Sequence, residues 1–583
     1  MSALLLGIRV LVFALSIFGY VAFLHQYTKL RVEFLPAVTF TGQICILFLG
    51  GILNLLPLTV GALVAVGLAL FVAELLKNRE GFRDFLCPAY IFFSVGCLYF
   101  LFLFKGQVFN SYDNFSHWAL VVKQMLLTNR FPNFQDNIIL FQSYPLGSSV
   151  FVYYVSKVIS PVSEGCQMFA QTMLNLSMIL PLFSCGKKQK ALNIFLVLGA
   201  SIFLLSYNIR PHELLVDTLL PLTGAAGFLL LEETLTKEEK FSWLAIPFAA
   251  SAILIKNSGI FFWALMAGRV LLYWIFHRKT ATKLEKLSWA GLCFVPLFFL
   301  LLWKKHVEYV FSSGMTSLHS MSIQAYTANL QEKSGEILVQ IVHAFAGKVF
   351  SGRSLLYLLA ILLLVSIVSF VGKQSLLPWA KTTLLLVGVY TVYQIGNLCM
   401  YAFSMPIGEA VVMAGYERYY RTVIIWCFVY AIYRILHWLD TQKAISAGAV
   451  ALVLLLCFYL MGGRLNILKR QSENWNRAEL ERIMATYPMS PSPACLIYIP
   501  EDDSGYTYHL TKYLLYTPTV DVHITSDEEE LAVSIETAKE IGYDYFINLD
   551  QGNEMIEGYC AKAYGLAEGV PLWHCRNKST SYS

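Results

Sequence analysis

Residues 57–76, PLTVGALVAVGLALFVAELL, form a run of twenty residues with one charged side chain, Glu74. A helix needs about 20 mostly apolar residues to cross a bilayer, so this run predicts a membrane-spanning helix. The polar segment that follows carries Lys77, Arg79 and Arg83. Long apolar runs and short charged loops alternate in this way along most of the chain, which predicts a polytopic α-helical membrane protein.

The composition supports this fold class. Of the 583 residues, 57% are apolar and 14% are charged, and the mean hydropathy is +0.58. Soluble globular domains carry about 25% charged residues, so the composition excludes a soluble enzyme. The net charge of +5 comes without any run dense in Lys and Arg. We therefore expect membrane lipid, and no nucleic acid, among the partners.

About fourteen apolar runs have the character of spanning helices. The first run lacks a small-residue cleavage site with a polar start behind it, so we interpret it as an anchor and not as a removed signal peptide. The runs are 3–24, 38–56, 57–76, 86–104, 166–184, 191–206, 214–231, 242–255, 258–277, 287–303, 353–371, 377–397, 419–438 and 444–461.

Three basic loops set the expected orientation. They lie at 77–83, 187–190 and 278–286, and short loops rich in Lys and Arg face the cytoplasm. The helix count puts all three on one side only if the apolar stretch 146–162 does not cross, so we expect that stretch to be juxtamembrane or re-entrant. The segments expected to face outward are 105–145, 207–213, 304–352, 398–418 and everything after 462.

The chain changes character near residue 470. Residues 494–500, 544–549 and 570–576 predict strands and 527–541 predicts an amphipathic helix, which together indicate a small α/β domain. The tail has no Gly-rich phosphate loop, so a nucleotide site has no support. We divide the chain into N-terminal transmembrane helices (1–104), an outward loop with juxtamembrane helices (105–165), a transmembrane core (166–462) and an extracytoplasmic α/β domain (470–583).

The twelve cysteines give no metal signature. Most of them fall inside apolar runs, where thiols behave as small hydrophobic groups, and no CxxC or Cys/His cluster occurs. Cys495, Cys560 and Cys575 lie in the polar tail. A Cys560–Cys575 disulfide and two free thiols are both open for that region.

The first outward segment holds the first candidate for chemistry. From Asp113 to Asn129 the apolar spacing predicts a short helix that Asp113 opens and caps. His117 follows four residues later, so the carboxylate and the imidazole share one face. Such a pair is suited to acid–base catalysis, although a capping residue and a surface histidine would give the same pattern.

Further ionisable residues fall at the outer ends of predicted helices. Ionisable groups at membrane depth are costly and usually functional, although a lysine can snorkel to the surface and an Arg can pair with a neighbouring Glu. They are Arg210, His212 and Asp217 in NIRPHELLVDTLL, Lys256 in ILIKNSG, and Glu417, Arg418 and Arg421 in AGYERYYRTV.

The order of these motifs resembles the GT-C superfamily of glycosyltransferases, which includes protein O-mannosyltransferases and the aminoarabinose transferase of lipid A. Asp113 matches the acid in the first large outward loop of that family, with Asn114 where a second acid is usual. Tyr144, Pro145 and Leu146 resemble the Pro–Leu that enters an apolar stretch.

Later motifs extend the resemblance to about residues 86–440. Asp217 matches an Asp at the head of a later helix, and Lys256 matches a Lys between two short helices. Arg418 and Tyr419 match an Arg–Tyr near the last helices, without the following Pro.

The resemblance implies a glycosyltransferase that moves a hexosyl or pentosyl group from a polyprenyl-phosphate donor to a hydroxyl of a cell-envelope glycan, lipid or protein, at the outer face of the cell membrane. It implies that Asp113 is the catalytic base and that His117 assists it. We assign no cofactor and no metal ligand; Asn114 argues against a metal bridged by paired acids, and metal dependence stays open. The implied donor-phosphate site is Lys256, Arg418, Arg210 and Arg421, and the implied substrate pocket is Asp217, His212, Tyr144 and Glu417.

Two other functions compete with this one. A polytopic transporter or a lipid or polysaccharide flippase would show inverted repeats and polar residues near the bilayer midplane, and the sequence shows neither. A non-catalytic scaffold that displays the tail leaves Asp113, Asp217 and Lys256 unexplained. A pocket at the outer surface that opens to lipid favours the enzyme, whereas a water-filled midplane pathway favours transport.

Overall fold

The structure is a computed structural model that describes residues 3–77, 80–185, 190–236, 241–277, 279–311, 323–371, 375–439, 469–525, 528–550 and 572–574, with a few single positions between 448 and 455. The chain divides into two compact units. The membrane unit comprises Met1–Gln107, Gln124–Phe131 and Phe141–Arg470, and the tail unit comprises Val108–Lys123, Pro132–Leu140 and Gln471–Ser583. Two pieces of the first outward loop therefore belong with the tail, a grouping that the sequence did not predict.

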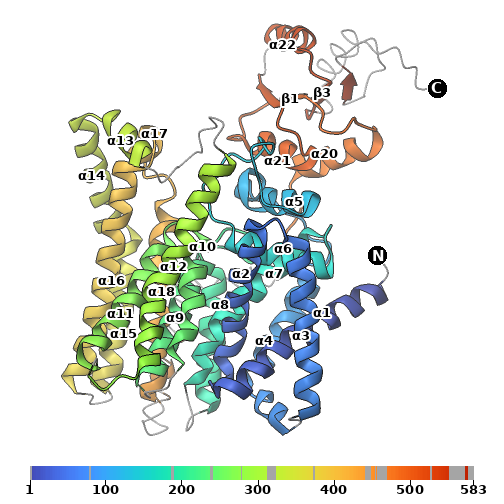
Figure 1. The fold of residues 1–583 in the computed structure, drawn as a ribbon. Helices are drawn as coiled ribbons and strands as arrows, with labels where there is room; N and C mark the ends of the chain where they lie inside the picture. Colours follow the sequence, from blue (N-terminus) through green and yellow to red (C-terminus); the bar gives the residue numbers. More distant parts are fainter. Residues whose placement is uncertain are drawn as a thin grey trace. The chain divides into compact units, whose positions relative to one another are not determined.

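Apolar helices build the membrane unit (Figure 1). Its first half contains α1 Ala3–Thr28, η1 Val32–Phe34, α2 Leu35–Ile52, α3 Leu56–Lys77, η2 Glu80–Phe85, α4 Pro88–Leu103, the end of α5 Ala119–Thr128, α6 Gly147–Ile159, α7 Glu164–Ile179 and η4 Leu180–Ser184. Its second half contains α8 Lys190–Ser206, α9 Leu219–Thr236, η5 Ser242–Ala245, α10 Ile246–Ile255, α11 Gly259–His277, α12 Lys283–Val310, α13 Ile323–Gln331, α14 Gly335–Phe350, α15 Arg353–Val371, α16 Leu376–Phe403, α17 Ile407–Val411 and α18 Tyr416–Leu439.

Among the described residues, nine helical stretches are long and apolar enough to cross a membrane, which indicates a multi-pass membrane protein. The sequence predicted about fourteen spans. Three of the others, α4, α8 and the η5–α10 stretch, are apolar but shorter than 18 residues. The predicted helix 444–461 lies outside the described residues, apart from a few single positions.

Two loop predictions can be compared with the structure. The stretch 146–162 forms α6, which has 13 residues, fewer than the about 20 that a spanning helix needs. Its side chains are largely buried, as expected for a segment that packs inside the bundle. The segment 304–352, which we expected to face outward, contains helix α14, which buries Ile341, Phe345 and Val349 at a spacing of four and belongs to the candidate membrane span Gly335–Phe370. That spacing places all three on one face, so this segment forms an amphipathic helix.

The tail unit has an α/β core. Its sheet has the order β2-β1-β3-β4, with β1, β2 and β3 parallel and β4 antiparallel to β3. Cys495 of β1 pairs with Val520 of β2 and with Tyr545 of β3. The elements are the π-helical turn η3 Asn114–Trp118, the start of α5, α20 Trp475–Thr486, β1 Cys495–Ile499, α21 Tyr506–Leu515, β2 Val520–Ile524, α22 Glu528–Ile541, β3 Tyr545–Asn548 and β4 Leu572–His574.

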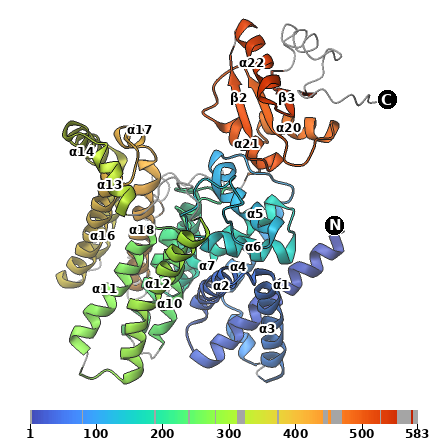
Figure 2. The same ribbon diagram turned by 45° about the horizontal axis from the view of Figure 1, so that its top comes forward.

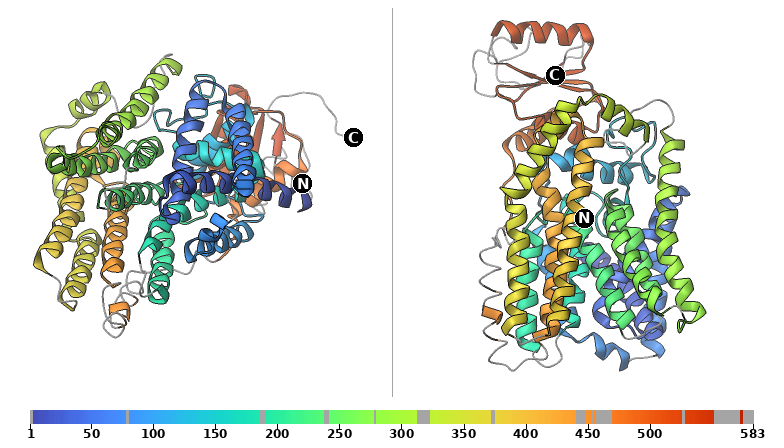
Figure 3. Two further views of the ribbon diagram at one scale, coloured as in Figure 1. Left: turned by 60° about the horizontal axis from the view of Figure 1, so that its bottom comes forward. Right: turned by 90° about the vertical axis from the view of Figure 1, so that its left-hand side faces the viewer.

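Helices lie on both faces of this sheet, with α22 on one side and α20 and α21 on the other (Figures 1, 2 and 3). The chain moves from β1 to β2 through α21, then back across β1 to β3 through α22. Right-handed crossovers in opposite directions put their helices on opposite faces. The predicted strands 494–500, 544–549 and 570–576 and the predicted helix 527–541 are confirmed; β2, α20 and α21 were missed.

Candidate functional site

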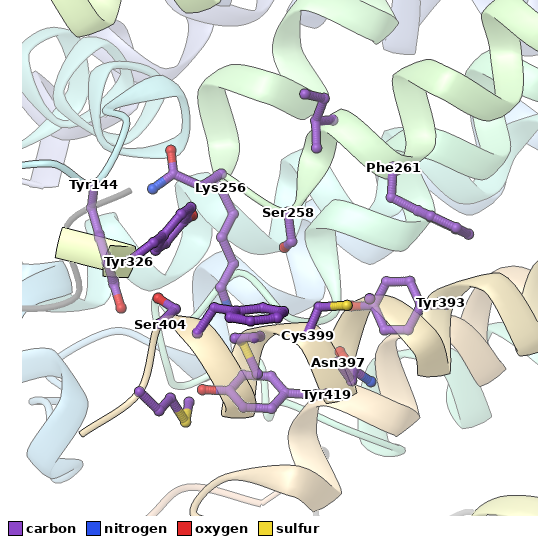
Figure 4. Close-up of a pocket in the computed structure, with 16 residues that line it drawn as sticks. Tyr144, Lys256, Ser258, Phe261, Tyr326, Tyr393, Asn397, Cys399, Ser404 and Tyr419 are labelled. Atoms are coloured by element: carbon purple, nitrogen blue, oxygen red, sulfur yellow. The ribbon is translucent and has the colours of Figure 1, made fainter. Parts of the chain in front are cut away.

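A cavity of about 380 Å³ lies in the membrane unit between the α10–α11 connector and the last turns of α16. Its wall is mostly aromatic and apolar, with Lys256 as its charged side chain among the described residues. Figure 4 shows Lys256 reaching from the connector toward the ring of Tyr419. Its lining includes Tyr144, Lys256, Asn257, Phe261, Tyr393, Asn397 and Tyr419.

Lys256 stands at the break between two helices. α10 ends at Ile255, and Lys256 takes up an extended backbone with φ −157° and ψ 148°. The chain restarts as α11 at Gly259, where a Cβ atom would lie 1.8 Å from the carbonyl oxygen of Ala252. Glycine is therefore required for this close return of the chain, and the break directs the Lys256 side chain away from both helix axes.

The Lys256 ammonium forms an ion pair with Asp217. Nζ lies 2.7 Å from Oδ1, and the two side chains are 19% and 4% exposed. Asp217 lies in the connector before α9, because that helix begins at Leu219 and not at the predicted residue 214. Burial alone would raise the pKa of Asp217, but the positive charges of Lys256 and Arg418 outweigh it and hold this pKa below its ordinary value.

Two side chains fix Asp217 against α18. The amide of Asn208 donates to the main-chain oxygens of Asp217 (3.2 Å) and Arg418 (3.1 Å). The hydroxyl of Thr422 is within hydrogen-bonding distance of the same two oxygens, at 3.2 Å and 2.9 Å. Residues on three separate segments are thereby held together, as the sequence-based site required.

Tyr419 links the two predicted cations. Its ring lies 5.2 Å from Lys256 Nζ and 6.0 Å from Arg418 Cζ, distances at which a cation is attracted to an aromatic face. Arg418 is half-buried. Of the predicted site residues, Tyr144 and Lys256 line the cavity. Asp217 contacts Lys256, and Arg418 lies near the lining residue Tyr419.

Sequence reasoning missed Lys333, which fixes the end of α16. Its buried ammonium donates to the carbonyl oxygens of Tyr401 (3.0 Å), Ala402 (2.9 Å) and Met405 (2.6 Å). A cation at a helix C-terminus satisfies carbonyls that have no partner within the helix. Because the last turns of α16 line the cavity, Lys333 shapes it from outside. A lone lysine just before an amphipathic helix is the only sequence signal for this role.

The remaining predicted cations lie elsewhere. Arg421 pairs with Glu417 at 2.7 Å, as the i,i+4 spacing on α18 favours, and lies over the ring of Tyr207. Arg210 is exposed and His212 is buried edge-on against Phe104. Burial and the charge of Arg210 lower the pKa of His212 to about 4. None of these four predicted residues lines the cavity.

Asp113 and His117 belong to the tail unit. The predicted helix is present as η3 followed by α5, but Asp113 makes no side-chain capping hydrogen bond, so the predicted cap is wrong. His117 is buried while Asp113 is half-exposed, and burial lowers the pKa of His117 to about 3.

The segment around Asp113 packs on the tail domain. The ring of Tyr112 meets His509, and the ring of Phe115 meets Tyr506 and Tyr513 of α21. On the other side, the guanidinium of Arg477 donates to the carbonyl oxygen of Phe109 at 2.8 Å. The tail therefore fixes the backbone on both sides of Asp113.

Within the described ranges, no group of three His, Cys, Asp or Glu side chains gathers as metal ligands would. The Cys560–Cys575 pair lies outside those ranges. No protein-family model matches this chain, and a search of curated proteins finds no significant match. The site itself must therefore carry the functional argument.

Proposed function

We propose that this protein is a membrane glycosyltransferase that takes a sugar from a polyprenyl-phosphate donor and transfers it to an acceptor hydroxyl of a cell-envelope glycan, lipid or protein, at the outer face of the cell membrane. One observation carries the proposal. The half-buried Lys256 lines an aromatic cavity inside a helical membrane unit and forms an ion pair with the buried Asp217. A purely structural position in such a unit would more cheaply hold apolar side chains.

The cavity wall matches the parts of a lipid-linked sugar. Tyr144, Phe261 and Tyr393 offer apolar and aromatic surface to a prenyl chain and to the faces of a sugar ring. Asn257 and Asn397 offer amide groups that can both donate to and accept from sugar hydroxyls. Lys256 offers positive charge to the phosphate.

The ion pair prepares Lys256 for an anion. An ammonium carries three N–H donors, and Asp217 accepts from it at 2.7 Å, so further donors can face the cavity. Asp217 fixes the direction of the Lys256 side chain. As the sugar departs, negative charge grows on the phosphate, so the contact with Lys256 strengthens in the transition state. Arg418, which also lies near the ring of Tyr419, is the second cation of this proposal.

The base of the proposed reaction is Asp113. Its carboxyl group is half-exposed, as an acceptor-facing base must be, whereas His117 is buried and its pKa of about 3 keeps it neutral. His117 is therefore better suited to holding the segment in place than to taking a proton. The proposed step removes the proton of the acceptor hydroxyl, joins its oxygen to the anomeric carbon, and releases the prenyl phosphate with the electron pair of the broken bond.

The experiment is a transfer assay with the purified full-length chain in lipid nanodiscs. Prenyl-phosphate sugars carrying a labelled hexose or pentose are supplied with a mixture of envelope glycans and lipids as acceptors. Transfer by the wild type and its loss in Asp113→Asn support the proposal. If the labelled lipid only changes leaflets in proteoliposomes and its sugar bond stays intact, the chain is a flippase and the proposal fails.

A further inference from the structure

A second, polar cavity of about 250 Å³ lies at another place in the membrane unit. It forms where the α1–α2 connector, the start of α4, the end of η4 and the start of α8 meet. Its lining combines charged, amide and thiol groups, namely Arg31, Glu33, Cys87, Cys185 and Asn193. The proposed glycosyl transfer uses none of these residues.

Asn193 gives the strongest evidence that this polar cavity binds a ligand. Its side chain is 2% exposed, and neither its Nδ2 nor its Oδ1 has a hydrogen-bond partner among the described residues. Buried amides are almost always hydrogen-bonded, because leaving one unpaired is costly. The amide lines the cavity and can both donate and accept hydrogen bonds, so a polar ligand in the cavity would satisfy it.

Arg31 adds a fixed cation to the same wall. Its Nη1 lies 3.4 Å from Oε1 of Glu233, and its Nη2 lies 3.5 Å from Oε1 of Glu33. A guanidinium has five N–H donors and matches the geometry of phosphate oxygens. Glu33 lines the cavity beside it and can accept from an ammonium or a hydroxyl. The wall thus fits a phosphate together with a polar substituent that donates hydrogen bonds.

An apolar cavity of about 410 Å³ follows along α4. Tyr90, Ser94, Cys97 and Leu101 line it, and together with Cys87 of the polar cavity they recur at spacings of three and four. Those spacings place Tyr90, Ser94, Cys97 and Leu101 on one face of the helix, whereas Cys87 precedes the helix with an extended backbone. The polar cavity is thus lined by the chain at the start of α4, and the apolar cavity by the turns that follow, together mostly with α1 and α2.

We propose that these two cavities bind one glycerophospholipid of the surrounding membrane. The headgroup occupies the polar cavity, with its phosphate toward Arg31 and its polar substituent toward Glu33 and Asn193. One acyl chain follows α4 through the apolar cavity. The lipid joins the α1–α2 connector to α4 and α8, and this role stands whether or not the chain transfers sugars.

The test counts lipids on the purified full-length protein by native mass spectrometry, in a detergent mild enough to retain them. Asn193→Leu keeps the side-chain size and removes the amide. The matched control is Asn175→Leu, since Asn175 is also buried with an unpartnered Oδ1 but lines neither cavity. We expect Asn193→Leu to bind added phospholipid about tenfold more weakly, the effect of one lost polar contact, and Asn175→Leu to bind as the wild type does.

A second variant tests the site proposed for the acyl chain of the lipid. Cys97→Trp fills the apolar cavity and should also reduce the retained phospholipid, while delipidation should lower the melting temperature of the wild type more than that of Asn193→Leu. Equal retention by the wild type and Asn193→Leu would overturn the proposal. Unchanged retention by Cys97→Trp, or retention of a prenyl phosphate in place of a glycerophospholipid, would overturn it as well.

Discussion

The ammonium of Lys256 lies 2.7 Å from Oδ1 of Asp217, so two residues that the sequence placed in different roles form one buried ion pair. The sequence motifs assign Lys256 to a phosphate and Asp217 to a substrate pocket. Because the two side chains pair, a substitution of one changes the environment of the other. Removing either partner leaves the other charge buried without its counter-ion, and effects on function must be separated from effects on folding.

Lys256→Met should destabilise the membrane unit, whereas the double variant Lys256→Met/Asp217→Asn should recover most of the loss. Breaking one side of a buried pair costs about 3–5 kcal/mol, while replacing both sides is often nearly neutral. The measurement is the free energy of unfolding in nanodiscs for both single variants and the double variant. Strictly additive effects of the two substitutions would show that the side chains do not interact.

Asp113→Asn should preserve folding and abolish transfer. The amide keeps the size of the carboxyl group but cannot take the acceptor proton, and general-base catalysis contributes about 10²–10⁴-fold to a rate. The turnover number and the unfolding temperature are measured on the same preparation. Near-normal turnover would remove Asp113 from the catalytic role.

The stability of the tail unit should fall as the pH drops from about 6.5 to 3. Burial lowers the pKa of His117 to about 3, so across this range only the unfolded state binds the proton. Stability is lost by up to about 1.4 kcal/mol per pH unit. His117→Phe should reduce the slope of the unfolding free energy against pH. Hydrogen exchange in the tail unit measures that free energy at each pH.

Part of that slope should survive in His117→Phe. Burial and Lys512 lower the pKa of His509 to about 4, so this residue titrates with the same sign. Replacement of the exposed His343 by Gln is the control and should leave the slope unchanged. An unaltered slope in His117→Phe would contradict the buried, neutral state of that imidazole.

Arg477→Met should loosen the segment that carries Asp113. Arg477 is 2% exposed, pairs with Glu481 at 2.7 Å and holds the carbonyl of Phe109, so its loss frees the backbone before Asp113. Hydrogen exchange over residues 108–118 should rise by about tenfold, equivalent to one lost charge-assisted hydrogen bond. Arg482→Met is the control, because Arg482 is 49% exposed and pairs with Glu479, three residues before it on the same helix. Equal exchange in both variants would show that Arg477 does not hold the segment.

The sequence predicted much of the fold because the strongest signals are local. Long apolar runs gave most helices, and the break in ILIKNSG correctly placed Lys256 between α10 and α11. Helix starts were less certain: α9 begins at Leu219, since the apolar residues before it continue an extended connector. The tail strand β2 was missed because VDVHI is short and its side chains alternate in burial only in part.

The sequence predicted which residues form the site better than it predicted which of them contact each other. Asp217 and Lys256 are 39 residues apart, and sequence periodicity carries no information about pairing across that distance. Lys333 escaped notice because its partners are main-chain oxygens of α16, which leave no trace in the side-chain pattern. The unequal burial of Asp113 and His117 also could not be predicted, because a spacing of four residues says nothing about how deeply each side chain is buried.

The most direct test of the central claim is equilibrium binding of a prenyl phosphate to the full-length protein and to Lys256→Met/Asp217→Asn. The double variant removes the cation without leaving a buried charge. The control replaces a different ion pair, between Arg269 of α11 and Glu232 of α9, in Arg269→Met/Glu232→Gln. The proposal predicts about 10–100-fold weaker binding by the first variant, the size of a charge-assisted contact, and unchanged binding by the control. Equal affinity of the wild type and Lys256→Met/Asp217→Asn would contradict the proposal that this cavity holds the donor phosphate.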